Sequence, residues 1–461
     1  MLKPTIFREY DIRGVADAEL LSEDVAALGQ ALGTYLRRHG GPHLCLGRDT
    51  RLSSTRLRDA LILGLKASGC HVTDIGVQPT PLLYYATVHT KADGGVMITG
   101  SHNPPEFNGF KAVLGAGTIY GEAIQEIRRM IETGDLDRGD GSETTMDAAT
   151  PYVEEVAAQF HFPCRIRVVV DAGNGVGGPV AHRVLERLNV EAVELFFEMD
   201  GHFPNHHPDP TVPRNLETLI ARVLETKADL GLAFDGDADR IGAVDERGSI
   251  LWGDQLMILY AREILTRKPG ATFIGEVKCS QLMYDDIAAR GGHPIMWKTG
   301  HSLIKAKMKE THAELAGEMS GHMFFADRYH GYDDALYAAC RLIEIVANSA
   351  RPLSTLLADL PHTVTTPEIR FDCPDEIKFE VVRLASAELR AGHQTVDVDG
   401  VRVLFPEGWG LVRASNTQPV LVMRFEATTP DLLAQYQREV EEVVERSKRQ
   451  AQLTASHQPP A

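Results

Sequence analysis

The sequence predicts an α/β protein of three or four domains, built on mixed or mostly parallel sheets. Three observations carry this prediction. The 461 residues exceed what a single hydrophobic core usually organises. Short apolar runs repeatedly end in polar turns and alternate with segments of helical apolar spacing. The pattern changes near residues 361–367, which are polar and flanked by proline, and the remaining chain reads as a smaller unit of different type.

The repeating units can be followed along the chain. Residues 43–49 are expected to form a buried strand, and residues 56–67 a helix with Leu57, Leu61 and Leu65 on one face. Residues 95–99 form another apolar run, with Ser101 just beyond its carboxyl end. The same pattern of strand and polar turn recurs at residues 166–171, 230–234 and 272–277. In such sheets ligands gather at the carboxyl ends of strands, so the polar turns there are candidate sites.

Softer signals mark the boundaries between units. Residues 133–150 are rich in Gly, Asp, Thr and Ser and read as a linker, and a helical stretch begins near Asp254. Beyond residue 367, residues 401–405 and 419–427 are expected to be strands around a loop. The final helix is expected to start with Thr429 as N-cap and Pro430 at its first position. The polar residues 450–461 are expected to be disordered.

Composition excludes several classes of protein. The net charge of −17 argues against a nucleic-acid partner, which would need a basic face. No apolar run approaches the roughly 20 residues that span a membrane, and the first residues lack the apolar core of a secretory signal. The six scattered cysteines contain no Cys-x-x-Cys pair and predict reduced thiols in a cytoplasmic protein. An acidic protein that binds anions must gather its cations locally, so the motif loops are where they are expected.

Two segments suggest phosphoryl transfer. Residues 99–111 (TGSHNPPEFNGFK) present a serine on a loop punctuated by glycine and proline, and residues 235–240 (DGDADR) present three carboxylates at alternate positions. Three hard oxygen ligands on one short loop can hold Mg²⁺, and a serine that carries phosphate needs such a counter-cation. Asp235, Asp237, Asp239 and Glu246 also fit an EF-hand loop, but Arg240 stands where that loop needs glycine.

A zinc site is a weaker alternative. His202, His206 and His207 lie close together in the sequence, but they lack a cysteine partner and ordered helical spacing. The glycine-rich residues 173–178 resemble a phosphate loop only superficially, because the lysine of a P-loop is missing.

With two further motifs, at residues 317–322 (GEMSGH) and 413–417 (RASNT), the chain resembles the α-D-phosphohexomutases over nearly its whole length. Within that family it is most similar to the bacterial enzymes that act on both mannose and glucose phosphates. The resemblance implies four domains around a central cleft, three with related mixed α/β sheets and a smaller C-terminal α+β domain. It implies boundaries at residues 1–147, 148–250, 251–362 and 363–461, each domain contributing one motif, and a monomeric enzyme.

The resemblance also implies a reaction. Phosphate would move between O1 and O6 of the hexose through a phosphoserine at Ser101 and a hexose 1,6-bisphosphate, with glucose 1,6-bisphosphate as activator. One Mg²⁺ would be held by Ser101, Asp235, Asp237 and Asp239, where it would withdraw charge from the transferring group. Proton transfer would fall to Lys111, whose pKa a neighbouring Arg13 is expected to lower, or to His322.

The remaining site residues are likewise implied by the resemblance. His102 and Arg240 would support the phosphoserine and the metal loop. Glu318 and Ser320 would recognise two adjacent sugar hydroxyls, which tolerates mannose and glucose because they differ only at C2. The substrate-binding set is completed by Tyr10, Lys278, Gly300, His301, Arg413, Ser415, Asn416 and Thr417. The open alternatives are a phosphoglucosamine mutase and a catalytically idle regulator that binds sugar phosphates.

Overall fold

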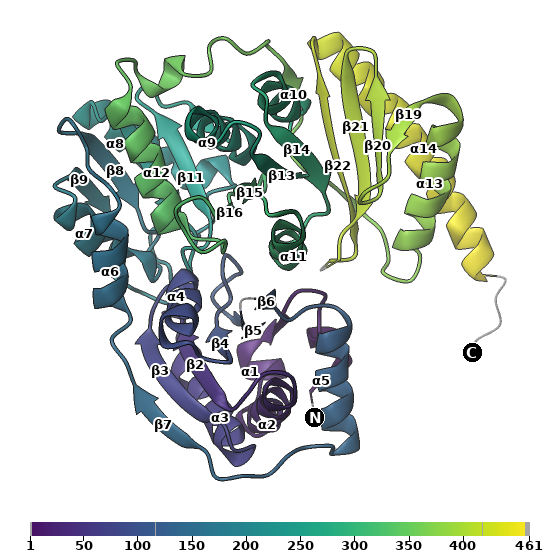
Figure 1. The fold of residues 1–461 in the computed structure, drawn as a ribbon. Coiled ribbons are helices and arrows are strands. Elements are labelled where there is room, and N and C mark those ends of the chain that lie inside the picture. Colours follow the sequence, from purple (N-terminus) through teal and green to yellow (C-terminus); the bar gives the residue numbers. More distant parts are fainter. Residues whose placement is uncertain (1, 116, 417, 457–461) are drawn as a thin grey trace.

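The structure of the protein, a computed structural model, describes residues 2–115, 117–416 and 418–456. Four β-sheets follow one another along the chain, each with its own helices, which confirms the predicted four-domain α/β fold (Figure 1). No helix in these ranges combines the length and the apolar character that crossing a bilayer requires.

The first domain has a sheet of order β1-β5-β4-β2-β3-β7, with β6 paired to β5. Its elements are η1 (Pro4–Ile6), β1 (Ile12–Val15), α1 (Ala16–Glu19), α2 (Ser22–His39), β2 (His43–Arg48), α3 (Ser54–Ala67), β3 (His71–Val77), α4 (Thr80–Thr90), β4 (Gly94–Ile98), β5 (Phe107–Leu114), β6 (Gly117–Thr118), α5 (Glu122–Thr133) and β7 (Ser142–Thr145). Two expectations are corrected here. Part of the expected linker is the edge strand β7, which pairs with β3, and the end of the serine segment belongs to β5.

The second domain has a sheet of order β12-β11-β10-β8-β9. Its elements are α6 (Ala149–Ala158), β8 (Arg167–Asp171), α7 (Gly177–Arg187), β9 (Glu191–Leu195), η2 (Pro213–Leu216), α8 (Glu217–Thr226), β10 (Leu230–Phe234), β11 (Ile241–Asp245) and β12 (Ile250–Leu251). Every residue of β10 is buried, because this central strand is covered on both faces of the sheet. It therefore appears in the sequence as a continuous apolar run rather than an alternating one.

The third domain has a smaller sheet of order β14-β13-β15-β16. Its elements are α9 (Gly253–Arg267), β13 (Thr272–Glu276), α10 (Gln281–Ala289), β14 (His293–Trp297), α11 (His301–Thr311), β15 (Leu315–Gly317), β16 (Met323–Phe325), α12 (Ala335–Asn348) and η3 (Leu353–Thr355). In the first three domains, parallel strands carry an antiparallel partner at one side, as at β4–β5, β10–β11 and β15–β16. The short loops after β4, β10 and β15 hold three of the four motifs.

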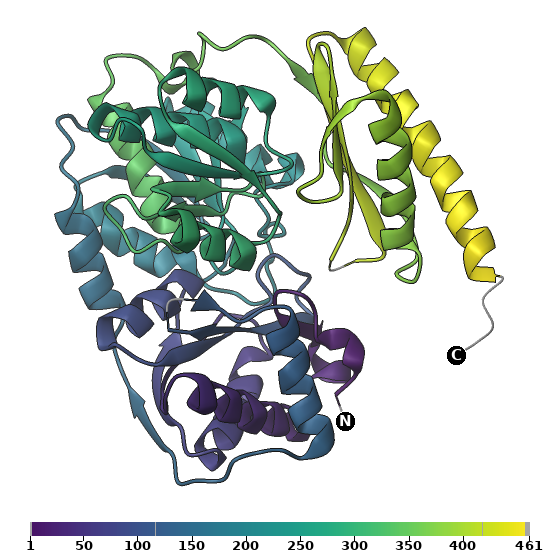
Figure 2. The same cartoon turned by 45° about the vertical axis from the view of Figure 1, so that its right-hand side comes forward.

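The fourth domain is an antiparallel sheet of order β17-β22-β21-β20-β19, with β18 also paired to β22. Its elements are β17 (Val364–Thr365), β18 (Ile369–Asp372), α13 (Lys378–Gly392), β19 (Gln394–Val396), β20 (Val401–Phe405), β21 (Gly408–Ala414), β22 (Val420–Ala427) and α14 (Pro430–Ser456). Helices α13 and α14 cover the face of the sheet that points away from the other domains (Figure 2). The predicted cap of α14 is confirmed, since the Leu432 amide donates to Thr429 Oγ1 at 3.3 Å. The expected disorder from residue 450 is wrong as far as Ser456, where the helix ends.

The clusters of buried apolar side chains show how tightly the four domains are joined. One cluster of buried side chains extends across the first three domains, from Leu82 in α4 through Val168 and Leu230 to Phe273 and Tyr337, while much of the first domain packs in a further cluster of its own. The fourth domain has a separate core between its sheet and its two helices. Among the described residues, a small apolar cluster that includes Val277, Trp409 and Leu411 joins it to the third domain. The first three domains therefore form one packed body, to which the fourth is attached.

Two arginines make most of the buried polar contacts at this attachment. Arg402 stacks on Trp409, with its guanidinium carbon 3.7 Å from the ring centroid, and donates to the carbonyl oxygens of Val277 and Cys279 at 2.7 Å each. Arg424 donates to the carbonyl of Lys278. The carbonyls all belong to the segment after β13, so the fourth domain is held against one loop of the third.

The junction between α6 and α12 carries a titratable group with a testable consequence. Asp334 caps α12 and accepts hydrogen bonds from Tyr152 of α6 at 2.9 Å and from Tyr329 at 2.7 Å. Burial raises the pKa of Asp334 from 3.8 to about 6. The folded chain then holds this proton more tightly than the unfolded chain, so the contribution of Asp334 to stability falls as the pH rises from about 4 to about 6.

We expect Asp334→Asn to remove this dependence of stability on pH. Relative to the parent, the variant should gain on the order of 2 kcal/mol in free energy of unfolding between about pH 4.5 and about pH 7. Urea denaturation at several pH values measures the difference, and Asp431→Asn, on the exposed first turn of α14, is the matched control. Parallel pH profiles for the parent and Asp334→Asn would contradict the prediction.

Candidate active site

Ser101 sits at the carboxyl end of β4 in a strained backbone conformation. Its φ angle of 48° lies in the left-handed region, which is uncommon for a residue with a side chain. The side chain is buried, and Oγ donates to Asp235 Oδ2 at 2.7 Å, with His102 Nδ1 at 3.0 Å on another side. A serine of the first domain thus contacts the carboxylate loop of the second.

The carboxylate loop connects the antiparallel strands β10 and β11. Ala238 turns the chain with a φ angle of 57°, and Asp235 Oδ1 accepts the backbone amides of Asp239 and Arg240, each at 3.2 Å. Ligand atoms of Asp235, Asp237 and Asp239 lie within 4.8 Å of one another, and all three side chains are buried. The flanking elements are strands, which excludes the EF-hand; Glu246 instead accepts hydrogen bonds from the amide and hydroxyl of Ser354.

Lys111, within β5, supplies positive charge to this triplet. Its Nζ donates to Asp237 Oδ2 at 2.8 Å and to Asp239 Oδ2 at 2.5 Å. Burial works to lower the pKa of Lys111, but the two carboxylates outweigh it and raise the pKa above the ordinary value. Burial also raises the pKa of Asp235 well above its usual range, reinforced by the neighbouring carboxylates.

The expected effect of Arg13 on Lys111 is wrong. We expected like-charge repulsion to lower the pKa of Lys111, whereas it is raised by the ion pairs with the aspartates. The guanidinium of Arg13 is occupied elsewhere, donating to Asp11 Oδ2 at 2.5 Å and to Asn103 Oδ1 at 3.0 Å. Arg13 therefore braces the serine loop from β1.

The triplet fits a divalent cation. Asp237 Oδ1 and Asp239 Oδ1 are buried and accept no hydrogen bond, which is costly unless a cation or another donor satisfies them. The raised pKa of Asp235 shows that one ammonium group is too little to keep all three carboxylates ionised, and carboxylate oxygens are the ligands that hard cations prefer. The donor set therefore suits a hard metal ion beside Ser101 Oγ.

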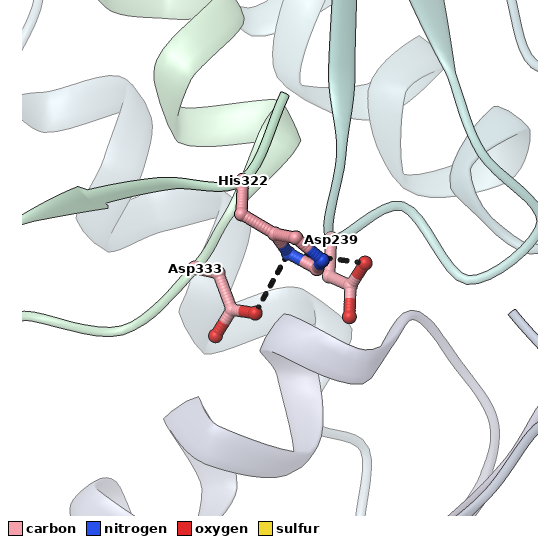
Figure 3. Close-up of side chains that lie close together, drawn as sticks. All are labelled: Asp239, His322 and Asp333. Atoms are coloured by element: carbon pink, nitrogen blue, oxygen red, sulfur yellow. Dashed lines mark ion pairs between the residues drawn. The ribbon is translucent and has the colours of Figure 1, made fainter. Parts of the chain in front are cut away.

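His322 lies between two carboxylates next to the metal loop (Figure 3). Its Nδ1 is 3.0 Å from Asp333 Oδ2 and 3.5 Å from Asp239 Oδ1, while Nε2 accepts a hydrogen bond from Arg240 Nε at 2.9 Å. Asp333 is in turn paired with Lys305 at 3.0 Å. An imidazole whose Nδ1 faces carboxylates carries its proton there, which leaves Nε2 as a basic lone pair.

The third motif forms a compact polar network. Glu318 Oε1 accepts the amide of Gly300 at 2.8 Å, and Oε2 accepts the Ser320 hydroxyl at 3.0 Å. Glu276, at the end of β13, accepts the amide of Met319 at 3.0 Å, and burial raises its pKa. Lys278 Nζ lies 3.4 Å from Glu276 and 3.1 Å from Glu368 of the fourth domain. The third motif and Lys278 are thus both held by the carboxylate of Glu276.

Tyr10 joins three domains at this network. Its hydroxyl donates to the carbonyl of Thr299 at 2.9 Å and accepts from Asn416 Nδ2 at 2.6 Å. Gly300 has a φ angle of 131°, and a Cβ there would lie 2.6 Å from the Tyr10 ring, so only glycine fits. His301 follows, with its ring centroid 5.7 Å from that of His322, and burial lowers its pKa well below the usual value.

The fourth motif contributes a buried arginine. Arg413 Nε donates to Asp399 Oδ2 at 2.8 Å, and the same carboxylate oxygen accepts the amide of Thr299 at 3.1 Å. Ser415 Oγ accepts the amide of Gln418 at 3.1 Å. Thr417, the remaining residue expected here, lies outside the described residues. Contacts between motif residues therefore link all four domains.

Sequence reasoning missed several residues that hold this site together. Asp333 and Thr80 contact His322 and Asp237, and Glu276 and Asp399 organise the loops of the third and fourth domains. Thr80, Glu276 and Asp399 lie far along the chain from these partners, and Asp333 meets His322 only because the chain turns back after β16, so no local spacing identifies them. Sequence reasoning also missed Asp49 and Arg51, which contact the serine loop from the polar turn after β2; one acid and one base within that turn were the available signal.

The histidines considered for zinc are used otherwise. His206 Nε2 contacts Asp171 at 3.0 Å, and its Nδ1 contacts the carbonyl of His207 at 2.9 Å. Within the described part of the chain, the side-chain groups able to share a metal are the aspartate triplet and the set of Asp239, His322 and Asp333. Neither includes His202, His206 or His207.

Comparisons with known proteins cover nearly the whole chain. Profiles described as phosphoglucomutase/phosphomannomutase match it in order, with α/β/α domains I, II and III at residues 4–138, 150–248 and 252–364 and the C-terminal domain at residues 368–443. A phosphomannomutase/phosphoglucomutase of Pseudomonas aeruginosa is 47% identical over 433 residues, 94% of each chain. A phosphoglucomutase of Neisseria gonorrhoeae is 44% identical over 445 residues, 95% of this chain and 96% of that protein. A crystal structure of a phosphoglucomutase/phosphomannomutase family protein from Burkholderia thailandensis matches with a TM-score of 0.91 at 44% identity, covering 97% of this chain and 98% of that one.

Proposed function

The chain belongs to the phosphoglucomutase/phosphomannomutase family and is a phosphohexomutase, and we propose that it moves phosphate between O1 and O6 of mannose and glucose phosphates. Ser101 carries the phosphate, giving it to a hexose monophosphate and taking back the other phosphate of the resulting 1,6-bisphosphate. One observation carries this proposal: the Ser101 hydroxyl lies 2.7 Å from Asp235, at the edge of the carboxylate triplet. Glucose 1,6-bisphosphate would load the serine.

The triplet would hold one Mg²⁺ through Asp235, Asp237 and Asp239, together with an oxygen on Ser101. When bound, the ion withdraws charge from the transferring phosphoryl group. Arg240, which follows the triplet, and Arg13, which binds Asn103 of the serine loop, would help to neutralise the phosphate. Burial lowers the pKa of His102 well below its usual value, so this residue would support the serine by hydrogen bonding rather than by charge.

Proton transfer would be shared between Lys111 and His322. Lys111 is held as an ammonium by Asp237 and Asp239, which raise its pKa, so it would donate a proton to the leaving oxygen only once a metal ion shares the charge of these carboxylates. His322 has its Nδ1 facing carboxylates, and its Nε2 accepts from Arg240 Nε at 2.9 Å, so it would accept the proton of the attacking hydroxyl once Arg240 turns to the phosphate. The carboxylate of Asp333 would stabilise the imidazolium that forms.

Sugar recognition is assigned to the network around Glu318 and Ser320. These two side chains would bind adjacent hydroxyls, O3 and O4, which mannose and glucose present alike. Lys278 and His301 border the network, and Gly300 allows Tyr10 to approach it. The non-reacting phosphate would be held by Arg413, Ser415, Asn416 and Thr417. Because clamp and serine are both fixed, the bisphosphate itself must turn between the two transfers.

We expect Arg413→Ala to act mainly on binding. Loss of a charged hydrogen bond to phosphate costs about 1.5–3 kcal/mol, which corresponds to a rise in KM of roughly ten- to a hundredfold. The value of kcat should change much less, because Arg413 contacts the phosphate that does not react. Steady-state kinetics with glucose 1-phosphate measure both constants, and Arg370→Ala on exposed β18 is the control. An unchanged KM would remove Arg413 from the clamp.

The substrate proposal is tested by coupled assays with mannose 1-phosphate, glucose 1-phosphate and glucosamine 1-phosphate. Turnover of the first two supports it, whereas turnover of the amino sugar alone would make the chain a phosphoglucosamine mutase. Turnover of none, with binding retained, would favour the idle regulator. Intact-mass analysis for one phosphate per chain tests the carrier serine independently of the sugar.

We also propose the domain boundaries 1–147, 148–250, 251–362 and 363–461, with a central cleft between the domains. The matched profile ranges support them, and the pairing of β17 with β22 supports the last boundary. We infer a monomer acting in the cytoplasm, where the six unpaired cysteines stay reduced. Sedimentation analysis tests the oligomeric state.

A further inference from the structure

The loop that carries Ser101 needs an external support. Placing Ser101 at a φ angle of 48° costs free energy compared with an ordinary backbone conformation, because its side chain crowds the backbone there. Such strain persists only where surrounding contacts over-determine it. The loop's own hydrogen bonds are few: the amide of Ser101 donates to Thr99 Oγ1 at 2.8 Å, that of Asn103 to the carbonyl of Gly100 at 2.9 Å and that of Phe107 to the carbonyl of Pro104 at 3.0 Å. Several of its carbonyls therefore need donors from elsewhere.

The buried side chain of Arg51 supplies those donors. Its Nη2 donates to the carbonyls of Ser101, at 2.8 Å, and Asn103. Its Nη1 donates to the carbonyls of Phe107, at 3.0 Å, and Pro104, at 2.5 Å. Its Nε donates to Asp49 Oδ2 at 3.1 Å. A guanidinium has five N–H donors, and all five are used here, four of them on the serine loop.

Asp49, Gly100 and Phe203 surround the guanidinium of Arg51 and complete the support. Asp49 Oδ2 also accepts the amide of Gly100 at 3.0 Å, while Oδ1 accepts the Arg51 amide at 3.0 Å and the Ser54 hydroxyl at 2.5 Å. A Cβ on Gly100 would lie 2.5 Å from the guanidinium carbon, so glycine is required for the approach. From the second domain, the ring of Phe203 lies 5.2 Å from the same carbon. The guanidinium is thus fixed on every side.

We propose that Arg51, oriented by Asp49, is a positioning residue for phosphoryl transfer: it holds the backbone of Ser101 so that Oγ faces the carboxylate triplet. This inference rests on the proposed function of Ser101. Arg51 acts through the carbonyl of the carrier serine and the three carbonyls bound beyond it, while Asp49 holds the amide of Gly100 before it. A shift of the reacting oxygen by about 1 Å can cost about a hundredfold in rate, so the support matters for kcat more than for substrate binding.

Arg51→Lys in the full chain tests the inference. Lysine keeps the positive charge but has three donors on one nitrogen, so it cannot reach four carbonyls and Asp49 together. We expect kcat to fall about tenfold to a hundredfold, with KM for glucose 1-phosphate changed less than about threefold. Phosphorylation of Ser101 by glucose 1,6-bisphosphate, followed by intact mass, should slow by a similar factor.

The matched control is Arg48→Lys. Arg48 is the last residue of β2, three residues before Arg51, and its guanidinium contacts Asp74 at 3.4 Å. The kcat of this control should stay within about twofold of the parent, which also shows that the mutase assay itself is sound. If Arg51→Lys lowers the melting temperature but keeps the parent's kcat and phosphorylation rate, or raises KM as much as it lowers kcat, Arg51 is merely structural and the inference is overturned. If Arg51→Lys does not fold, Asp49→Asn decides on the same criteria, since it removes the carboxylate that orients the guanidinium with little change in volume. Inactivity of the parent towards every hexose phosphate would instead count against the proposed function.

Discussion

Ser101→Ala is expected to reduce kcat by roughly 10³-fold or more while the chain stays folded, because the variant lacks the oxygen that is proposed to carry the phosphate. The side chain lost is small, and its one strong contact is the hydrogen bond to Asp235 at 2.7 Å. Its removal should cost no more than about 1–3 kcal/mol of stability. Coupled assays measure the rate, and intact mass measures the phosphate, which should disappear from the variant.

Ser142→Ala is the matched control for this experiment. Ser142 is exposed on β7 of the same domain, and its hydroxyl contacts His71 rather than the carboxylate loop. This variant should keep the parent's kcat and its phosphate. A phosphate that persists in Ser101→Ala, or turnover close to that of the parent, would move the carrier role to another residue.

Lys111→Met should weaken both stability and turnover, and the loss of stability should depend on metal. The ammonium of Lys111 is buried between Asp237 and Asp239, and its removal leaves buried carboxylates without their cation. In EDTA we expect the free energy of unfolding to fall by about 3–5 kcal/mol, since breaking a buried ion pair from one side is far costlier than losing a surface pair. Because Mg²⁺ can neutralise the same oxygens, saturating Mg²⁺ should restore much of this loss.

Turnover of Lys111→Met should stay about 10²- to 10⁴-fold below that of the parent even in Mg²⁺, as expected for a lost proton donor. Denaturant titrations with and without Mg²⁺ and coupled assays give the two readouts. The control is Lys66→Met, whose ammonium is partly exposed and lies 3.8 Å from Glu143. Equal stability of Lys111→Met and the parent in EDTA would show that the triplet does not depend on this lysine.

Local patterns predicted the parts of the fold that local physics determines. Apolar runs located the central strands, and Thr429 with Pro430 located the start of α14, because strand burial and helix capping act over a few residues. The edge strand β7 was missed because its polar residues look like a linker, and only its pairing with β3 makes it a strand. The helical end of α14 was missed because a polar composition does not exclude a helix that continues from a packed segment.

The site shows the same limit. Motif spacing was enough to predict that Asp235, Asp237 and Asp239 lie together, since three carboxylates on one turn share a location wherever the chain goes. Partners that meet only through folding, such as Asp333 with His322 or Asp399 with Arg413, leave no mark at any fixed spacing. The predicted direction of the pKa shift of Lys111 was wrong for the same reason, because the shift depends on which charges surround the ammonium after folding.

The fourth domain is fastened differently along its two borders with the rest of the molecule. On one border, Arg402 and Arg424 bury their charges beside Trp409 against the loop after β13, and separating them would expose groups that nothing replaces. On the other border, Asn416 with Tyr10, and Asp399 with Thr299, make hydrogen bonds that water can replace one for one. We therefore expect the fourth domain to stay attached at the border with Arg402 and Arg424 and to open at the border with Asn416 and Asp399. Such a rotation would give a hexose bisphosphate room to turn without being released.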